Sequence, residues 1–309
     1  MELISPPILK AGDAVGIVAP ARKITWEEVQ PALTLLQSWG LRVVMGDHLF
    51  GDYHQFSGTD KQRGHDFQQM IENPEIKAII CARGGYGTIK LLDYINLRDL
   101  QREPKWLVGY SDITVLHSIL NSWFKMETIH GTMPINFPSS GVSNESTESL
   151  RRVLFGESPT YNFQTHQLNR TGIAKGELCG GNLSVLYSIA ATDADVNTNN
   201  KILFIEDLDE YLYHIDRMMM NLRRSGKLSG LAGLVVGGMT SMNDNTIPFG
   251  RNAFEIIRLA VADYHFPVCF GFPAGHQEEN LALIMGRSAT LNVQDNGCSL
   301  AFEPAACKL

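Results

Sequence analysis

Short apolar runs alternate with longer amphipathic segments over residues 1–135 of the chain. A short run that is apolar throughout predicts a strand buried on both faces, whereas apolar positions three and four apart predict a helix. The predicted strands are 14–20, 41–46, 76–85 and 105–110, and the predicted helices are 59–72, 88–95 and two that begin at Thr25 and Ile113. This alternation predicts a parallel sheet covered by helices.

The helix predicted at Thr25 has a sequence signal for its start, but it also contains a proline that disfavours a helix. Thr25 and Glu28 have the spacing of a capping box, in which each side chain accepts the backbone N–H of the other. Pro31 lies beyond the first turn, where proline removes a hydrogen-bond donor. We therefore expect the helix either to kink at Pro31 or to begin later.

The composition changes between Pro134 and about Thr171 to Pro, Ser, Gly, Asn and Thr, interrupted by one short helical stretch at 145–155. We interpret 136–170 as a linker between a domain at 1–135 and a second α/β domain at 171–309. The predicted elements of the second domain are strands at 201–207 and 231–238, a helix with Ile215, Met218 and Leu222 on one face, a helix at 252–263, and an apolar run from Val268.

The composition excludes two broad classes of protein. The 309 residues are 44% hydrophobic and 19% charged, which is too apolar and too weakly charged for a disordered chain. The 26 basic and 33 acidic side chains give a formal net charge of -7, without a run of Lys or Arg. Because phosphate neutralisation supplies most non-specific affinity for nucleic acids, this balance argues against a dedicated nucleic-acid binder.

Three further features predict a cytoplasmic protein without a membrane partner. The N-terminal MELISPPILKAGD lacks the regions of a secretory signal, and no stretch approaches the ~18 apolar residues of a membrane-spanning helix. The cysteines are odd in number and lack CxxC spacing, which disfavours a disulfide framework and a zinc knuckle. No HxxxH or HExxH motif occurs, so we expect neither a metal nor another cofactor. The five cysteines are Cys81, Cys179, Cys269, Cys298 and Cys307.

Two candidates for chemistry follow strands of the first domain, where ligand sites of open α/β sheets gather. Ser111 stands between a strand and a helix start, which can present a nucleophile. A helix cap is the alternative, and GYSDI lacks the second glycine of GxSxG. The glycines of 82–87 (ARGGYG) let backbone N–H groups approach a phosphate or an oxyanion, although a tight turn would need them too.

Two more candidates lie in the second domain. Glu206 comes at the end of an apolar strand, where an acid can orient a histidine. Asp207, Asp209 and Glu210 beside it suit a solvated acidic loop equally well. His276 follows an apolar run and a Pro/Gly turn, which presents a histidine at a sheet edge, and a purely structural histidine is the alternative.

Taken in order along the chain, seven segments resemble the LD-carboxypeptidase family of serine peptidases, which includes muramoyltetrapeptide carboxypeptidases and microcin C self-immunity peptidases. The segments are GDAVGIVAPA, CARGGYGTIKLLDYIN, LVGYSDITVLH, the HG of IHGTM, CGGNLSVL, LFIEDLDE with the following IDRM, and GFPAGH. They extend nearly from end to end of the chain. One departure is Thr132, which stands where the family often has proline and restores a backbone donor.

The resemblance implies a triad in which Ser111 is the nucleophile, His276 the general base and Glu206 the acid that orients the imidazole. It also implies a flavodoxin-like N-terminal domain and a smaller C-terminal α/β domain, with the active site at their junction, in a homodimer. We expect the backbone N–H groups of Gly85 and Asp112 to form the oxyanion hole. The implied reaction is removal of the terminal D-alanine from murein tetrapeptides in cytoplasmic peptidoglycan recycling.

A carboxypeptidase must bind the free carboxylate of its small peptide or muropeptide substrate, and a cation does this best. Arg83, beside the glycines, is our first candidate and Arg217 the second, although either could pair with Glu206 or its acidic neighbours instead. Glu278 or Glu279 would suit the amine of a diaminopimelate residue.

Three other functions are compatible with parts of this pattern. A microcin C-type peptidyl-nucleotide amide hydrolase needs an aromatic ring against the adenine, and the sequence does not place Trp26, Trp106 or Trp123 there. An α/β-hydrolase esterase has the same chain order of Ser, acid and His, but it needs GxSxG and HGGG-type motifs that are absent. A non-catalytic peptide-binding protein would keep its affinity after Ser111→Ala.

Overall fold

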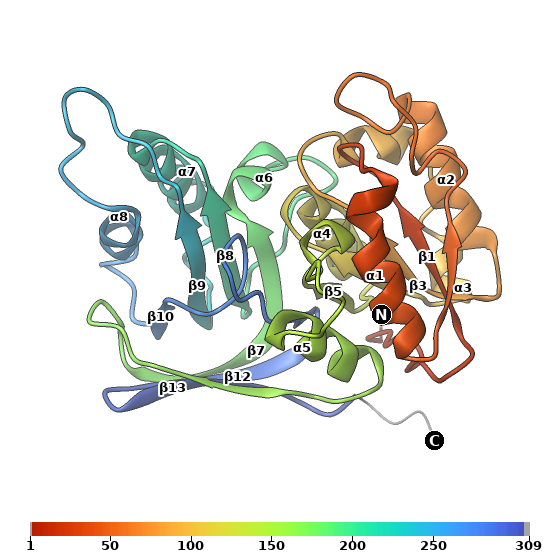
Figure 1. Ribbon diagram of the computed structural model, residues 1–309. Helices are drawn as coiled ribbons and strands as arrows, with labels where there is room; N and C mark the ends of the chain where they lie inside the picture. Colours follow the sequence, from red (N-terminus) through yellow and green to blue (C-terminus); the bar gives the residue numbers. More distant parts are fainter. Residues whose placement is uncertain (1, 306–309) are drawn as a thin grey trace. The chain divides into compact units, whose positions relative to one another are not determined.

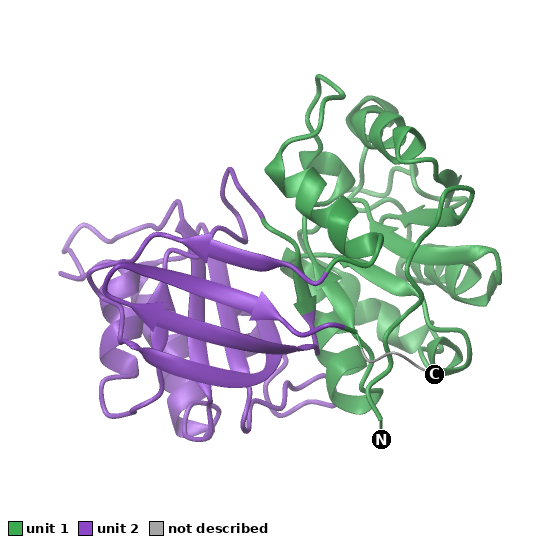
Figure 2. Ribbon diagram, turned by 90° about the horizontal axis from the view of Figure 1, so that it is seen from below, with its two compact units in different colours: residues 1–157, 281–284, 305–309 green, residues 158–280, 285–304 purple. Residues whose placement is uncertain are grey.

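The computed structural model describes residues 2–305 and divides into two compact units (Figure 2). The first unit holds the chain up to Glu157 and the short segment Leu281–Ile284, and the second holds Ser158–Asn280 and Met285–Pro304. Each unit has its own sheet, and apolar residues are buried around each sheet. The chain therefore passes from one unit to the other more than once.

The sheet of the first unit has six strands in the order β11-β5-β4-β3-β1-β2. Strands β1, β3 and β5 of this sheet are labelled in Figure 1. Strands β1 to β5 pair in parallel, and their order is the flavodoxin-like order 2-1-3-4-5. All four strands predicted for this domain are present, so the predicted fold class is confirmed. The strands are β1 (Ala14–Val18), β2 (Arg42–Met45), β3 (Ile76–Cys81), β4 (Trp106–Gly109), β5 (Thr128–His130) and β11 (Leu283–Met285).

Helices α1 (Trp26–Ser38), α2 (Asp60–Glu72) and α4 (Thr114–Trp123) pack against strands of this sheet. The capping box of α1 is formed, because Oγ1 of Thr25 accepts the Glu28 N–H and Oε2 of Glu28 accepts the Thr25 N–H. The helix runs through Pro31, so a start after this proline is wrong. The missing donor removes one backbone hydrogen bond, which a capped helix tolerates.

The shorter elements of the first unit lie in its connections. The segment predicted as a helix at 88–95 is the 3-10 helix η1 (Thr88–Asp93). The others are α3 (Asp99–Arg102), η2 (Ser111–Ile113), η3 (Pro134–Asn136) and α5 (Glu145–Leu154).

The second unit is built on a seven-stranded sheet in the order β10-β9-β8-β7-β12-β13-β6. Strands β10, β9, β8 and β7 pair in parallel, as the alternation of strands and helices predicts. From β7 onward the pairing is antiparallel, and this half was not predicted. The strands are β6 (Thr160–Phe163), β7 (Gly172–Asn182), β8 (Ile202–Leu208), β9 (Gly233–Thr240), β10 (Val268–Phe270), β12 (Ser288–Gln294) and β13 (Gly297–Phe302).

Three helices belong to the parallel half of this sheet, namely α6 (Leu183–Ser188), α7 (Leu212–Arg224) and α8 (Ala253–Ala260). The predicted apolar face of α7 is buried, since Ile215, Met218 and Leu222 are almost fully inaccessible to solvent. Across residues 2–305, no helix is both long enough and apolar enough to span a bilayer.

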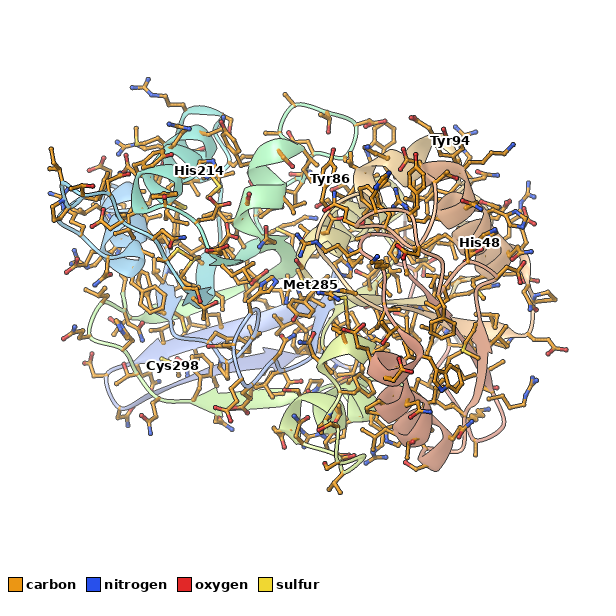
Figure 3. All side chains as sticks on the ribbon, turned by 45° about the horizontal axis from the view of Figure 1, so that its top comes forward. His48, Tyr86, Tyr94, His214, Met285 and Cys298 are labelled. Atoms are coloured by element: carbon orange, nitrogen blue, oxygen red, sulfur yellow. The ribbon has the colours of Figure 1, made fainter. Side chains whose placement is uncertain are left out.

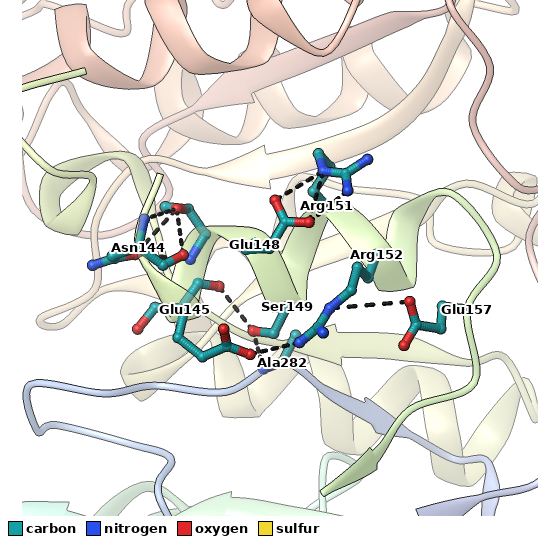
Figure 4. Close-up of polar contacts among 10 residues, drawn as sticks. Asn144, Glu145, Glu148, Ser149, Arg151, Arg152, Glu157 and Ala282 are labelled. Carbon is teal, nitrogen blue, oxygen red and sulfur yellow. Dashed lines mark hydrogen bonds and ion pairs between the residues drawn. The ribbon is translucent and has the colours of Figure 1, made fainter. Parts of the chain in front are cut away.

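The segment interpreted as a linker, 136–170, is not a separate connection in the structure. Its helix α5 belongs to the first unit, where the Ser149 hydroxyl accepts the backbone N–H of Ala282 at 3.1 Å (Figure 4). Its strand β6 belongs to the second unit and pairs with β13. The units therefore differ from the predicted domains 1–135 and 171–309, because both flanks of the segment are packed into a sheet or a core.

Candidate active site

Ser111 lies at the turn that follows β4 and opens η2. Its backbone has φ +64°, a left-handed conformation that a residue with a Cβ rarely adopts. The alternative that Ser111 caps the following helix is wrong, since the cap positions of η2 and α4 are Tyr110 and Ile113. Strain of this kind persists only where the surroundings impose it, and it occurs often at functional sites.

The glycines after β3 pack closely against Ser111. A Cβ on Gly84 would lie 2.8 Å from Cβ and 3.0 Å from Oγ of Ser111, so only glycine fits there without displacing the serine. Gly85 is exposed and has φ +121°, which also favours glycine. Among the described residues, no backbone hydrogen bond outside the helices and strands uses the N–H of Gly85 or of Asp112 as donor.

The side chain of Asp112 joins the Ser111 turn to the glycine loop. Its Oδ2 accepts the backbone N–H of Thr88 at 2.8 Å, and the carboxyl group is almost completely buried. Burial raises the pKa of this carboxyl, although its hydrogen bond to Thr88 and the nearby Arg63 oppose the rise. Asp112 therefore ties the turn after β4 to the start of η1.

Arg63 supports the same loops from α2. Its side chain is fully buried, and its guanidinium donates to the carbonyls of Pro20, Gly58 and Gly87 and pairs with Asp60. Burial lowers the pKa of Arg63, and Asp60 opposes that change. No local sequence pattern predicts this role of Arg63, because the carbonyls that it binds come from distant segments.

Glu206 and His276 form a close pair within the second unit. Nδ1 of His276 lies 2.7 Å from Oε2 of Glu206, and the same oxygen accepts the backbone N–H of His276 at 3.1 Å. Glu206 is completely buried near the end of β8, and 14% of the His276 side chain is exposed. A carboxylate against Nδ1 is an arrangement that fixes the orientation and the tautomer of an imidazole.

The loop that carries His276 is shaped around this pair. A Cβ on Gly275 would lie 2.7 Å from Glu206 side-chain atoms, and Gly275 has φ +101°. Oδ1 of Asn280 accepts the Gly275 N–H at 2.8 Å, and Oγ1 of Thr240 donates to the His276 carbonyl at 2.6 Å. Asn280 and Thr240 hold the loop through its backbone, and neither residue was predicted from the sequence.

Asp207 is a second buried carboxyl beside Glu206. It accepts from Nδ2 of Asn182 and from the backbone N–H groups of Ser184 and Leu208, each at 2.9 Å. Burial, and next the neighbouring Glu206, raise the pKa of Asp207 to about 7. The alternative of a solvated acidic loop is therefore wrong for Glu206 and Asp207, which are buried.

The residues predicted to bind substrate contact neither Ser111 nor the Glu206–His276 pair in any hydrogen bond or ion pair found among the described residues. Nη1 of Arg83 is 3.7 Å from Oε1 of Glu28, and the Arg217 guanidinium lies over the Tyr213 ring at 5.2 Å from its centroid. Among the described residues, neither arginine pairs with Glu206. Glu278 is exposed beyond His276, and so is its neighbour Glu279.

The structure thus brings the predicted residues together in two groups. Ser111, Gly85 and Asp112 belong to the first unit, and Glu206 and His276 belong to the second. Within residues 2–305, no three His, Cys, Asp or Glu side chains are grouped so that they could hold a metal ion. A serine at a strained turn and a buried acid–histidine pair are features that occur in serine hydrolases.

Comparison with known proteins identifies the family within this class. Residues 15–131 match the LD-carboxypeptidase N-terminal domain, and residues 175–291 match the LD-carboxypeptidase C-terminal domain. A probable murein peptide carboxypeptidase of Bacillus subtilis is 34% identical over 94% of this chain and 92% of its own length. The chain belongs to the LD-carboxypeptidase family.

Solved structures share the fold over nearly the whole chain. The muramoyltetrapeptide carboxypeptidase from Oxalobacter formigenes has a TM-score of 0.86 at 25% identity, covering 95% of this chain and 100% of the other. The microcin self-immunity protein MccF, in complex with aspartyl sulfamoyl adenosine, has a TM-score of 0.85 at 22% identity, covering 99% and 100%. At this identity the second likeness concerns the fold alone.

Proposed function

We propose that this protein is a serine LD-carboxypeptidase that removes the terminal D-alanine from murein tetrapeptides. The observation that carries the proposal is the buried Glu206–His276 pair, because a carboxylate on Nδ1 leaves Nε2 as a base. The names of relatives from Bacillus subtilis and Oxalobacter formigenes support the murein substrate. Peptidoglycan recycling in the cytoplasm and a homodimer belong to the same proposal.

The catalytic steps follow from the chemistry of these side chains. Catalysis requires that Oγ of Ser111 come within hydrogen-bond reach of Nε2 of His276, which takes its proton as Oγ attacks the peptide carbonyl. The developing oxyanion accepts from the N–H groups of Gly85 and Asp112, and each such donor typically lowers the barrier by ~3 kcal/mol. D-alanine leaves with the proton from His276, and water then hydrolyses the acyl-enzyme.

Substrate recognition calls for a cation on the terminal carboxylate. Arg83 is our first candidate, since its guanidinium is about one-third exposed at the loop after β3. A substrate carboxylate would compete there with a 3.7 Å contact to Glu28 and a 3.5 Å hydrogen bond to the Lys23 carbonyl. Arg217 is the second candidate, and exposed Glu278 would bind the amine of the diamino acid.

Hydrolysis of a peptidyl-nucleotide amide is the second candidate function, and the fold shared with the microcin self-immunity protein MccF supports it. Trp26 and Trp123 are 44% and 56% exposed, so their rings are accessible to a base. Trp106 is buried among the strands and cannot stack on a nucleotide. The same triad would cut either substrate, so the leaving group distinguishes the two functions.

The test is mass spectrometry of a murein tetrapeptide incubated with the wild-type protein and with Ser111→Ala. We expect the wild type to release one alanine and Ser111→Ala to release none. The matched control is Ser139→Ala, an exposed serine in a loop of the same unit, which should cleave like the wild type.

The remaining outcomes each contradict part of the proposal. Release by Ser111→Ala would show that Ser111 is not the nucleophile. Cleavage of a peptidyl sulfamoyl adenosine, with an intact tetrapeptide, would favour the nucleotide substrate. Unchanged binding of the tetrapeptide without turnover in any variant would indicate a peptide-binding protein.

A further inference from the structure

One arginine of the first unit lies directly against the glycine loop beside Ser111. Arg22 follows β1, and its backbone N–H donates to the Gly84 carbonyl at 3.3 Å. Its aliphatic stem lies against Gly85, because a Cβ on Gly85 would be 2.6 Å from Cγ and 2.7 Å from Cδ of Arg22. A Cβ on Gly84 would be 3.0 Å from Oγ of Ser111, so Arg22 and Ser111 pack on neighbouring residues of one loop.

The backbone around Arg22 is also held from the other side. Arg22 forms a β-bridge with Phe56, and the N–H of the next residue, Lys23, donates to the Gln55 carbonyl at 3.0 Å. The stem of Arg22 therefore starts from a fixed backbone and packs against Gly85. A side chain that is already ordered in this way loses less entropy when it binds a ligand.

Arg22 differs from the two neighbouring cations in its lack of an acidic partner. Lys23 pairs with Asp52 at 2.5 Å, and Arg83 lies 3.7 Å from Glu28 and donates to the Lys23 carbonyl. Within the part of the chain that the structure describes, the Arg22 guanidinium has no hydrogen bond or ion pair, and the residue is exposed. An exposed guanidinium with a packed stem and no acid beside it is suited to an anionic ligand.

The chemistry of a carboxypeptidase limits where the cation for the terminal carboxylate can lie. The scissile carbonyl and the terminal carboxylate belong to adjacent residues of the substrate, so the cation must be close to both the nucleophile and the oxyanion donors. Arg22 meets this requirement, since its stem lies against Gly85, one residue from the contact of the loop with Ser111. Figure 3 labels the next residue, Tyr86, whose side chain is half exposed, so the loop is accessible to a ligand.

We propose that Arg22 binds the free C-terminal carboxylate of the substrate and thereby selects peptides that end in a free acid. The inference rests on the proposed carboxypeptidase function. The guanidinium donates N–H groups to the carboxylate oxygens, and such charge-assisted hydrogen bonds are stronger than those between neutral groups. Arg83 has contacts to Glu28 and Lys23 to replace before it can do the same, so Arg22 supplies the main contact.

The experiment compares two substrates that differ only at the C-terminus, namely the murein tetrapeptide as its free acid and as its C-terminal amide. Arg22→Met should lower kcat/KM for the acid roughly thirtyfold, mainly through KM, because loss of a hydrogen bond to a charged group has an effect of this size. The amide carries no charge at this end, so both proteins should cleave it equally well. Methionine keeps an unbranched stem against Gly85, which separates loss of charge from loss of packing.

Three further variants sharpen this comparison. Arg22→Lys should recover part of the activity on the acid. Arg42→Met is the matched control, at an exposed arginine of β2 that pairs with Glu75, and it should cleave both peptides like the wild type. An equal loss on acid and amide with Arg22→Met would show a purely structural role and overturn the proposal. A preference for the acid that is lost with Arg83→Met but kept with Arg22→Met would overturn it too.

Binding measurements separate this inference from the proposed function. Calorimetry of the acid with Ser111→Ala, and with the same protein carrying Arg22→Met, should show roughly thirtyfold weaker binding to the second protein, and the amide should bind both equally. Equal affinities of the two proteins for the acid, or no measurable affinity of either, would overturn the role of Arg22. A wild type that binds the acid without releasing alanine would contradict the proposed function, and the same calorimetry would still decide whether Arg22 holds the carboxylate.

Discussion

Ser111 holds a left-handed backbone conformation, and the residues around it show what maintains that conformation. Gly84 lies against the serine side chain, so the position of Oγ depends on the absence of a Cβ at residue 84. A methyl group there would meet Cβ of Ser111 at 2.8 Å, which real Cβ atoms do not tolerate. The backbone conformation of Ser111 and the glycine at position 84 therefore depend on each other.

Gly84→Ala should lower kcat for tetrapeptide cleavage roughly a hundredfold, because a displacement of about 1 Å at a reacting atom has an effect of this size. Steady-state kinetics checks this expectation. The control is Gly58→Ala, whose Cβ would meet only the flexible Gln62 side chain, at 3.1 Å. Equal kcat values for Gly84→Ala and the wild type would show that the contact does not position Ser111.

Asp207 makes the stability of the second unit depend on pH. Its pKa is about 7 in the folded protein and near 3.8 in the unfolded chain, so the folded state binds the proton more tightly. The contribution of Asp207 to the free energy of unfolding is therefore largest below pH ~4. It falls by up to about 4 kcal/mol as the pH rises toward 7. The hydrogen bonds that Asp207 accepts remain available to the ionised form.

Urea unfolding of the wild type and Asp207→Asn between pH 4 and pH 8 measures this contribution. The free energy of unfolding of the wild type should fall relative to that of the variant as the pH rises. Asp47→Asn, at an exposed position, should follow the wild type. A constant difference between wild type and Asp207→Asn would show that Asp207 titrates normally in the folded state.

At the scale of elements, Asp112 couples the two loops that would supply the oxyanion donors. Asp112→Ala leaves the buried Thr88 N–H without its acceptor and frees η1 from the Ser111 turn. We expect kcat to fall roughly tenfold or more with little change in KM, because the donors act mainly in the transition state.

Asp112→Asn keeps a side-chain oxygen for the Thr88 N–H and should recover much of the lost kcat. Thermal unfolding of both variants separates this role from stability, since a purely structural role would lower the melting temperature without changing kcat of the folded protein. A rise in KM at constant kcat would show that Asp112 acts in substrate binding instead.

The elements also show where sequence patterns are sufficient. Period-3.6 segments and short apolar runs predicted most of the parallel strands and most helices, because each of these elements buries a face that its own sequence specifies. The parallel strands β5 and β7 were not predicted. The hairpin of β12 and β13 had a signal that was missed. Ala289, Leu291 and Val293 alternate with polar residues, and Asp295–Asn296 connects the strands.

Other parts of the site have no local signal in the sequence. The resemblance to the LD-carboxypeptidase family suggested the roles of Ser111, Glu206 and His276. Their positions at strand ends alone also allowed a helix cap at Ser111, a solvated acidic loop at Glu206 and a structural role for His276. Arg63 occupies an ordinary polar position of an amphipathic helix, and only the fold brings the Pro20 and Gly87 carbonyls to it. The hydrophobic pattern of the sequence does not predict contacts between segments that are far apart along the chain.

At the scale of the whole molecule, the first unit is completed by a segment from late in the chain. Leu283 and Ile284 of β11 are completely buried, and burial of such side chains contributes about 2 kcal/mol each. The fragment 1–157 should therefore be less stable than the same fragment with 281–285 attached through a flexible linker, as measured by urea unfolding. A fusion carrying Leu283→Ser is the control, and equal stability of all three would contradict a structural role for β11.

This arrangement has a consequence for the order of events during synthesis. The ribosome finishes β1 to β5 long before it reaches Leu283, so the edge of β5 stays open while most of the second unit is made. The nascent chain needs protection of that edge throughout this interval. The sheet that carries Ser111 is completed only after Glu206 and His276 have been synthesised.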